Sequence, residues 1–455
     1  MPRSPRIHVP VILAAAAALA QAQDTRKVVE PKIPPACATL EAKIARAGSS
    51  LAPDSENMPD TARIQAAIDG CRNGHAVVLR RASERLDAFL SGPLELRSGV
   101  VLVVDRGAFL FASRNPRDYD LSPGVCGTIT SQGRGCKALI NGLDAADSGV
   151  MGDGVIDGRG GETILGQNLT WWHLADQARK GGTQNVPRLL ILNRCNNFVL
   201  YKITLMNSPN FHVAYNNGNG FTAWGVKIWS PERARNTDGI DPGNSTNITI
   251  THCFIHTGDD QVAIKAPQGA PTTHISVVHN HFYTGHGMSI GSNTDGGASA
   301  IFVSDLSIDG ADNGLRIKSN TTRGGLVHDI VYEDVCISDT ANPIVMDTNY
   351  SAHVSEAQER IPVFRDILIR NVRVTGGGKV MLEGLDGQHR LAIHFDNVQF
   401  DDPGAMKVSA KHADVAIGPG PFNLKIAGDD VNVADKSTPA PPNSCSGKFV
   451  PFPAP

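Results

Sequence analysis

Short apolar runs, each the length of a β-strand, alternate with turn residues from residue 76 onward. Glycine, asparagine, aspartate and serine separate the runs, and no helical spacing of apolar residues connects them. The first runs are 77–79, 100–104, 138–140, 149–158, 189–193 and 198–206. This pattern predicts an all-β protein, either a sandwich or a solenoid, and the spacing of the later runs decides between the two.

An apolar residue recurs at steps of 24 to 29 residues through the middle of the chain. Members of this series are Ile240, Ile264, Ile290, Ile317 and Met346. A variable period in this range is typical of one turn of a parallel β-helix, whose strands keep register while the loops differ in length. A polar turn residue follows each member: Asn244, Gln268, Asn293, Asn320 and Asn349. Asparagine tolerates left-handed backbone angles, and stacked asparagine amides can bond along a ladder.

The two ends of the chain differ from this repeat. A basic start, an apolar middle and a small-residue end predict a secretory signal peptide over 1–22, and no later run is long enough to span a membrane. We expect residues 23–455 to form a single β-helix domain. Its amino-terminal cap is a helix within about 59–72 that starts at Asp60, and a proline-rich tail over about 430–455 is irregular and packs outside.

Net charge and cysteine content restrict the classes of binding partner and indicate the redox compartment. The net charge of −3 gives no field that would recruit nucleic acid or an acidic membrane, so we expect neither partner, and a monomer. Eight cysteines allow about 105 pairings in an oxidising compartment. We expect Cys37 to pair with Cys71 and Cys126 with Cys136. Buried free thiols are expected in strand-like runs, at Cys195, Cys253 and Cys336.

Four polar segments accompany the apolar series. They are N-T-D-G-I-D at 236–241, G-D-D-Q-V-A-I-K at 258–265, G-H-G-M-S-I-G-S at 285–292 and R-I-K-S at 316–319. Coils of a β-helix lie about 4.8 Å apart, so side chains on successive segments should meet in one site. Crowded carboxylates disfavour one another's ionisation, and at least one pKa should be raised, as glycosidic hydrolysis requires.

Strand alternation assigns the cations to the outer surface. If Ile317 points inward, Arg316 and Lys318 point outward, above the small residues Ser289 and Gly291 of the preceding coil. Two other patterns are weaker evidence for a functional site. The histidines at 274, 279 and 281 lie along one strand without a supporting carboxylate, so surface positions are favoured over a metal site. The glycines near Gly152 lack the third glycine and the helix of a dinucleotide loop, so a turn is favoured.

With the segments D-T-A-R-I-Q-A-A-I-D from Asp60 and G-D-G-V-I-D-G-R-G from Gly152, the four polar segments resemble the polygalacturonases of glycoside hydrolase family 28. The resemblance implies a right-handed parallel β-helix that hydrolyses α-1,4-galacturonosyl links of polygalacturonate or pectin with inversion, without a cofactor or metal. Asp259 looks like the general acid, and Asp238 and Asp260 like the pair that activates water. His286 looks like the residue that maintains the protonation of the acid.

The resemblance also implies substrate-binding residues. Arg316 and Lys318 look like a clamp for the substrate carboxylate, Asn236 opens its segment as in the family, and Tyr350 resembles a subsite aromatic. No large insertion flanks the segments, which favours attack within the polymer over attack at its ends. A pectate lyase is the nearest alternative and would need calcium and a strong base. A non-catalytic polysaccharide-binding β-helix is another, although it has no reason to gather three carboxylates.

Overall fold

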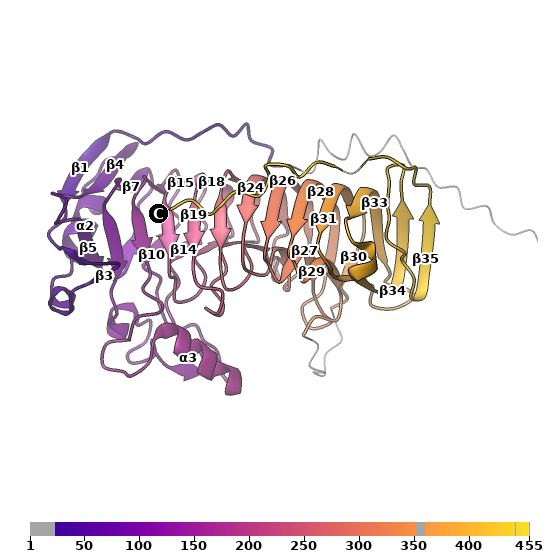
Figure 1. The fold of residues 1–455 in the computed structure, drawn as a ribbon. Coiled ribbons are helices and arrows are strands. Elements are labelled where there is room, and N and C mark those ends of the chain that lie inside the picture. The colour runs from indigo at the N-terminus through magenta and orange to yellow at the C-terminus, as the bar shows by residue number, and fades with distance from the viewer. Residues whose placement is uncertain (1–22, 352–359, 442, 455) are drawn as a thin grey trace, which may run out of the picture.

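Successive coils of the chain stack their strands in parallel around one apolar interior, giving a right-handed parallel β-helix (Figure 1). The computed structural model describes residues 23–351, 360–441 and 443–454. The expected signal peptide over 1–22 lies outside these residues. A parallel sheet of 31 strands contains nearly all of the described strands and confirms the predicted solenoid.

The strands form three faces, A, B and C, which follow one another around each coil. Face A contains β6 (Leu94–Glu95), β10 (Ile140–Leu143), β14 (Leu190–Asn193), β17 (Val213–Asn216), β20 (Ile240–Gly243), β23 (Val262–Ile264), β25 (Met288–Gly291), β27 (Asn313–Lys318), β29 (Asn342–Asp347), β32 (Gly378–Glu383) and the start of β34 (Met406–Ile417). The candidate chemistry lies on this face.

Faces B and C are separate in the early coils and continuous later. Face B contains β1 (Ala36–Glu41), β4 (His75–Arg80), β7 (Val100–Val104), β11 (Gly149–Met151), β15 (Phe198–Tyr201), β18 (Asn219–Trp224), β21 (Thr246–Thr251), β24 (Thr272–Phe282), β26 (Ala298–Asp309), β28 (Leu326–Ser338), β30 (Val363–Phe364), β31 (Ile367–Thr375), β33 (Leu391–Phe400), the end of β34 and β35 (Asp429–Asp435). Face C contains β5 (Ala88–Ser91), β8 (Phe109–Ala112), β12 (Val155–Asp157), β16 (Thr204–Met206), β19 (Lys227–Trp229) and β22 (Phe254–His256). From β24 onward one long strand serves both faces.

Strand register confirms most of the apolar series. Ile264 pairs with Ile290, Ile290 with Ile317 and Ile317 with Met346, and all four side chains are fully buried. Ile240 breaks the series, because it pairs with Val262 and not with Ile264. That coil is two residues shorter than the spacing of the series suggests. A shift of two keeps the alternation of the strand, so Ile240 still points into the core.

The predicted column of turn residues is largely wrong. Of its five members only Asn244 has a left-handed backbone (φ 48°), and its amide binds the carbonyls of Pro267 and Ala270, not another amide. Left-handed residues form columns at other places, and one of these columns lies at the bend between faces B and C. Its members, one in each coil, are Lys202, Gly225, His252, His279, Asp305, Asp334, Asn371 and Asn397. Gly152 also stands at a turn, where an added Cβ would lie 2.1 Å from the Val104 carbonyl oxygen.

The expected amino-terminal helix is α2 (Thr61–Asp69), and it covers the first coils. Ile64 and Ile68 are fully buried in the main core. Asp60 occupies the N-cap position, but its carboxylate accepts no capping hydrogen bond. It binds Arg63 instead and accepts the backbone N–H of Leu90 at 3.2 Å, which ties the helix to face C.

An insertion that the sequence did not predict follows β12 and projects beside face A (Figure 1). It contains α3 (Trp171–Gln177), which begins where the Thr170 hydroxyl accepts the backbone N–H of His173. It also contains β13 (Thr183–Gln184), which pairs with β9 (Ile129–Thr130) from the loop before β10. The remaining short elements are β2 (Arg46–Ala47), β3 (Ser50–Leu51), η1 (Pro53–Asn57), η2 (Pro116–Tyr119), η3 (Ala178–Lys180) and η4 (Pro403–Ala405). No helix of the described residues is long and apolar enough to cross a membrane.

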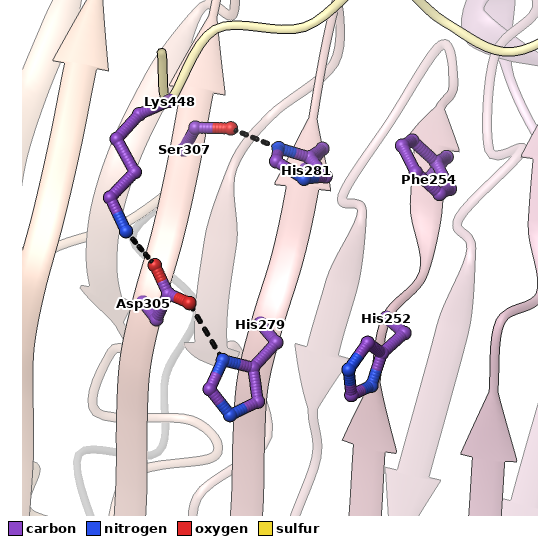
Figure 2. Close-up of a pocket in the computed structure, with 7 residues that line it drawn as sticks. All are labelled: His252, Phe254, His279, His281, Asp305, Ser307 and Lys448. Atoms are coloured by element: carbon purple, nitrogen blue, oxygen red, sulfur yellow. Dashed lines mark hydrogen bonds and ion pairs between the residues drawn. The ribbon is translucent and has the colours of Figure 1, made fainter. Parts of the chain in front are cut away.

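The irregular tail begins after β35, later than the expected start near residue 430. From there it runs back over the outside of earlier coils (Figure 1). Tyr283 donates its hydroxyl to the Val450 carbonyl at 3.0 Å, and the Lys227 ammonium donates to the Ala454 carbonyl at 3.1 Å. Figure 2 shows Lys448 of the tail bound to Asp305, which also accepts from His279. The expectation that the strand histidines lack a carboxylate is therefore wrong, because the adjacent strand β26 supplies one.

Both predicted disulfides are present, joining Cys37 to Cys71 and Cys126 to Cys136. Cys195 and Cys253 are buried free thiols, as expected. The expectation of a free thiol at Cys336 is wrong, because Cys336 pairs with Cys445 of the tail across 109 residues of sequence. Its partner comes from the returning tail, which the local strand pattern does not reveal.

We expect replacement of Cys445 by serine to release the tail and to lower the free energy of unfolding by about 2–5 kcal/mol. The crosslink closes a long loop, so its loss restores chain entropy to the unfolded state. Chemical denaturation measures the free energy, and amide hydrogen exchange reports faster opening of the tail. Ser446→Ala, at an exposed neighbouring position, is the matched control. Equal stability and equal exchange in Cys445→Ser and wild type would contradict this role.

Candidate active site

Four neighbouring strands of face A bring the polar segments together. Asp238, Asp260 and His286 each stand two positions before residues that pair in register, so they occupy equivalent places in three successive coils. Arg316 pairs with Ser289 and Lys318 with Gly291, as the alternation predicted. The side chains that the sequence placed in one site therefore meet on the outer side of β20, β23, β25 and β27.

Asp260 is the most enclosed carboxylate of the site, with 2% exposure. Lys318 donates to Oδ2 at 2.8 Å, and Ser289 donates to Oδ1 at 2.8 Å. Arg316 also binds Oδ1 and donates from Nε to the Ser289 hydroxyl at 3.0 Å. Burial works to raise the pKa of the Asp260 carboxyl, but the two cations outweigh it and hold the pKa well below its usual range. Asp260 is therefore ionised at neutral pH.

Asp259 contacts His286 across the adjacent coil. The Asp259 Oδ1 lies 3.0 Å from His286 Nδ1 and accepts the backbone N–H of Asp260 at 2.9 Å. Burial favours the neutral forms of both groups, but their mutual hydrogen bond and charge outweigh it, so the pKa of Asp259 is lowered and that of His286 is raised. Asp312, which is largely exposed, lies 3.3 Å from the other imidazole nitrogen. The pair thus favours the protonated imidazole beside an ionised Asp259.

The Asp259–His286 pair should give a measurable pH dependence. The raised pKa of His286 means that its contribution to stability is complete below the ordinary value of 6.5 and is lost as the pH rises through the folded pKa. The lowered pKa of Asp259 means that its contribution is complete above 3.8 and is lost as the pH falls through the folded pKa. In Asp259→Asn we expect the pKa of His286 to fall, as measured by NMR titration. Asp153→Asn is the control, and an unchanged pKa in Asp259→Asn would contradict the pairing.

Asp238 belongs to a second charged group that the sequence did not predict. Its Oδ2 lies 3.1 Å from the Lys265 ammonium, which also binds Asp241. The Oδ1 atoms of both carboxylates are buried without a hydrogen-bond partner among the described residues. Burial, and then the neighbouring charge of Asp241, raise the pKa of Asp238 well above its ordinary value. One carboxyl of the site thus has a raised pKa, as expected, but burial and Asp241 are larger causes than the crowding of Asp238 with Asp259 and Asp260 on which the expectation rested.

A buried histidine behind the site holds the backbone of Asp238. His212 lies with Nδ1 3.0 Å from the Asp238 carbonyl oxygen and Nε2 3.0 Å from the Ser230 hydroxyl. Burial lowers the pKa of His212 to about 4, so this imidazole is neutral at physiological pH. It supports the strand that carries Asp238 without adding charge.

The expected substrate-binding residues lie around this cluster. Asn236 has a left-handed backbone (φ 57°) and accepts a hydrogen bond from the Gln184 amide at 3.0 Å. Tyr350 places its ring 5.1 Å from the Lys318 ammonium and 5.9 Å from the Arg316 guanidinium carbon. Arg316 and Lys318 are 6% and 5% exposed and already bind Asp260, so they are less free than an open clamp would be.

Three side chains of the site have the spacing of metal ligands. Potential ligand atoms of Asp259, Asp260 and His286 lie within 4.8 Å of one another. However, the oxygens of Asp260 already accept from Arg316, Lys318 and Ser289, and two fixed positive charges beside it oppose a further cation. The chemistry of this donor set is therefore that of an ion-paired acid–base cluster.

Opposed protonation defines the chemistry of the cluster. Burial raises the pKa of Asp238 and favours its neutral form, whereas the two cations lower the pKa of Asp260 and favour its ionised form. Together with the Asp259–His286 pair, the cluster holds carboxyl groups of different proton affinity and an imidazole whose pKa is raised. Such a set can supply both an acid and a base, which is the requirement of glycoside hydrolases. The fold and the site thus indicate an enzyme that hydrolyses glycosidic bonds.

Comparison with known proteins gives the family. A model of "Glycosyl hydrolases family 28" matches residues 120–417. A polygalacturonase of Ralstonia nicotianae is 42% identical over 427 residues, covering 82% of this chain and 80% of the relative. An endo-polygalacturonase of Pectobacterium parmentieri is 42% identical over 393 residues, covering 86% and 93%. The solved polygalacturonase of Erwinia carotovora ssp. carotovora superposes with a TM-score of 0.75 at 40% identity, covering 91% and 97%. The chain belongs to glycosyl hydrolase family 28.

Proposed function

We propose that this glycoside hydrolase cleaves α-1,4-galacturonosyl links of polygalacturonate, with inversion and at internal positions of the polymer. The observation that carries the proposal is the fixed pair Arg316 and Lys318 beside the ionised Asp260. The Arg316 guanidinium and the Lys318 ammonium have more N–H donors than they use on Asp260 and Ser289, and these donors suit a polymer with a carboxylate on every sugar. The relatives named polygalacturonase and endo-polygalacturonase support the same substrate and internal attack.

Asp259 is the general acid of the proposed reaction, and His286 stores its proton. In the free protein the imidazole lies 3.0 Å from the carboxylate, and the raised pKa of His286 and the lowered pKa of Asp259 favour a proton on the imidazole. An anionic sugar bound beside this pair adds negative charge, which raises the pKa of Asp259 and favours its protonated form. The acid can then protonate the leaving oxygen of the glycosidic bond.

Asp260 activates the water in this proposal, and Asp238 assists. Asp260 is ionised and can accept a proton from water, whereas burial raises the pKa of Asp238 and makes it the less ready of the two to ionise. Inversion places water between the base and the bond, with the acid and base carboxyl groups roughly 6.5–9.5 Å apart. Asn236 and Tyr350 contact the sugar on either side of the cluster.

The segment 1–22 favours export as part of this proposal, because it combines a basic start, an apolar middle and a small-residue end. A secreted monomer acting on extracellular pectin fits that segment and the disulfides of the mature chain.

Product analysis over time on polygalacturonate tests the proposed function. We expect a fast fall in viscosity with mixed oligomers, saturated products and no loss of activity in a chelator. Monomer or dimer alone would mean attack at chain ends. Unsaturated products and loss of activity in a chelator would mean a lyase and would overturn hydrolysis. Binding without any release of reducing ends would mean a non-catalytic polysaccharide-binding protein.

A further inference from the structure

Arg188 is a half-buried arginine beside face A. Asp241 and Asp238, which both bind Lys265, are the acidic groups whose charges act on its guanidinium. Arg188 stands two positions before β14, in register with Phe211 and then with Asp238 in the next two coils. Its Nε donates to the Asn210 side-chain oxygen at 3.3 Å, and its guanidinium carbon lies 4.4 Å from the centre of the Phe211 ring. It forms no ion pair with an acidic side chain of the described residues.

Elsewhere this protein pairs its enclosed arginines. Arg159, which is 2% exposed, binds Glu56 and Glu162, and Arg316 binds Asp260. Three of the described arginines form no ion pair and are half-buried rather than exposed: Arg188, Arg235 and Arg323. All three lie in the sequence within five residues of a strand of face A. A partly desolvated guanidinium without a counter-ion is unfavourable, so an anionic ligand at face A would stabilise it.

The surroundings of Arg188 hold it in place and leave donors free. The Phe211 ring also contacts the Lys265 ammonium, 3.9 Å from its centre, so one aromatic ring lies against two cations. Lys265 is occupied by Asp238 and Asp241. Arg188 has no such partner, and its terminal nitrogens donate no hydrogen bond to a described residue.

We propose that Arg188 binds a carboxylate of the polymer on the amino-terminal side of the reaction centre, opposite to Arg316 and Lys318. The inference rests on the proposed function, because it takes galacturonate as the substrate. Two coils separate Arg188 from Asp238, a distance of about 10 Å along the helix axis. A bound chain would then be held by its carboxylates on both sides of the cleaved bond, as internal attack requires.

The length of the substrate provides the test. For Arg188→Gln we expect kcat/KM on long galacturonate oligomers and on the polymer to fall about 10- to 100-fold, mainly through KM, because one charge-assisted contact is lost. The loss should grow with the length of the oligomer and be smallest for the shortest substrate. Arg188→Lys, which keeps the charge but not the fork, should recover part of the loss. Arg85→Gln, at an exposed arginine without an ion pair, is the matched control.

An equal loss at every length, or no loss at any length, would overturn the assignment. Equal melting temperatures show that the variants remain folded.

A binding measurement separates the role of Arg188 from the proposed function. In an Asp259→Asn background, calorimetry compares galacturonate oligomers with their methyl esters, and Arg188→Gln should weaken binding of the acid form only. If wild type hydrolyses no galacturonate but binding still depends on Arg188, the proposed function fails and the Arg188 site stands. If binding is independent of Arg188, the site is overturned.

Discussion

Asp259→Asn should lower kcat for polygalacturonate by about 10²- to 10⁴-fold while the polymer still binds, because the variant cannot donate a proton to the leaving oxygen. Asparagine has nearly the same shape as aspartate, so the backbone contact between the Asp259 carbonyl and His286 N–H, 2.9 Å long, can remain. Release of reducing ends measures turnover, and calorimetry measures binding.

The control for this variant is Asp153→Asn, which changes an exposed carboxylate paired with Arg106. Its activity should equal that of wild type. Turnover of Asp259→Asn within about tenfold of wild type would exclude Asp259 as the general acid, since a positioned acid contributes more than this. The fall in the pKa of His286 expected for the same variant would still be seen, so the two roles can be separated.

Asp260→Asn should lower both activity and stability. The substitution leaves Arg316 and Lys318, which are 6% and 5% exposed, facing a neutral amide. Removing one partner of a buried ion pair costs about 3–5 kcal/mol, because the remaining charge has lost its solvation without compensation. Chemical denaturation at neutral pH measures this change, and reducing-end release should fall below detection.

Asp69→Asn provides the comparison for stability, because Asp69 and Arg97 form an exposed pair. That change should cost at most about 1 kcal/mol. If Asp260→Asn were as stable as Asp69→Asn, burial of the Arg316 and Lys318 charges would not require Asp260, and the ion-paired cluster would be contradicted.

The apolar series predicted the fold because side chains along a strand alternate between core and surface, and this alternation does not depend on loop length. Ile264, Ile290, Ile317 and Met346 face the core in successive coils, and any spacing that preserves alternation gives the same interior. Ile240 shows the limit of this reasoning. Its coil is shorter, so counting residues gave the wrong pairing although the side chain still points inward. Loop length, which varies freely in a solenoid, therefore limits the prediction of register.

The site residues could be predicted where one short segment contains both the polar residue and the apolar strand residues that fix its position. Asp238, Asp260, His286, Arg316 and Lys318 follow from such segments. Side-chain contacts between residues of different segments could not be predicted in the same way. Lys265 closes one predicted segment, but its contact with Asp238 depends on the short coil. Asp312 reaches His286 from a loop, and α3 has no repeat to indicate it.

Cys336 illustrates the same limit at longer range. Its apolar neighbours fit a buried thiol, and only the returning tail brings Cys445 to it. A tail has no periodicity, so the coils that it crosses cannot be read from its sequence. Its anchors are local contacts such as that of Tyr283 with Val450.

The last strand, β35, has a consequence for colloidal behaviour. A stack of parallel strands ends in a row of unpaired backbone groups, which another copy could extend into a fibre. Here the terminal strand carries Asp429, Asp430 and Asp435, and most of its side chains are exposed. Asp430 is paired with Arg390 and His412, whereas Asp429 and Asp435 form no ion pair with a described residue. Charged side chains on an edge strand oppose the addition of another strand, and this protection weakens at high ionic strength.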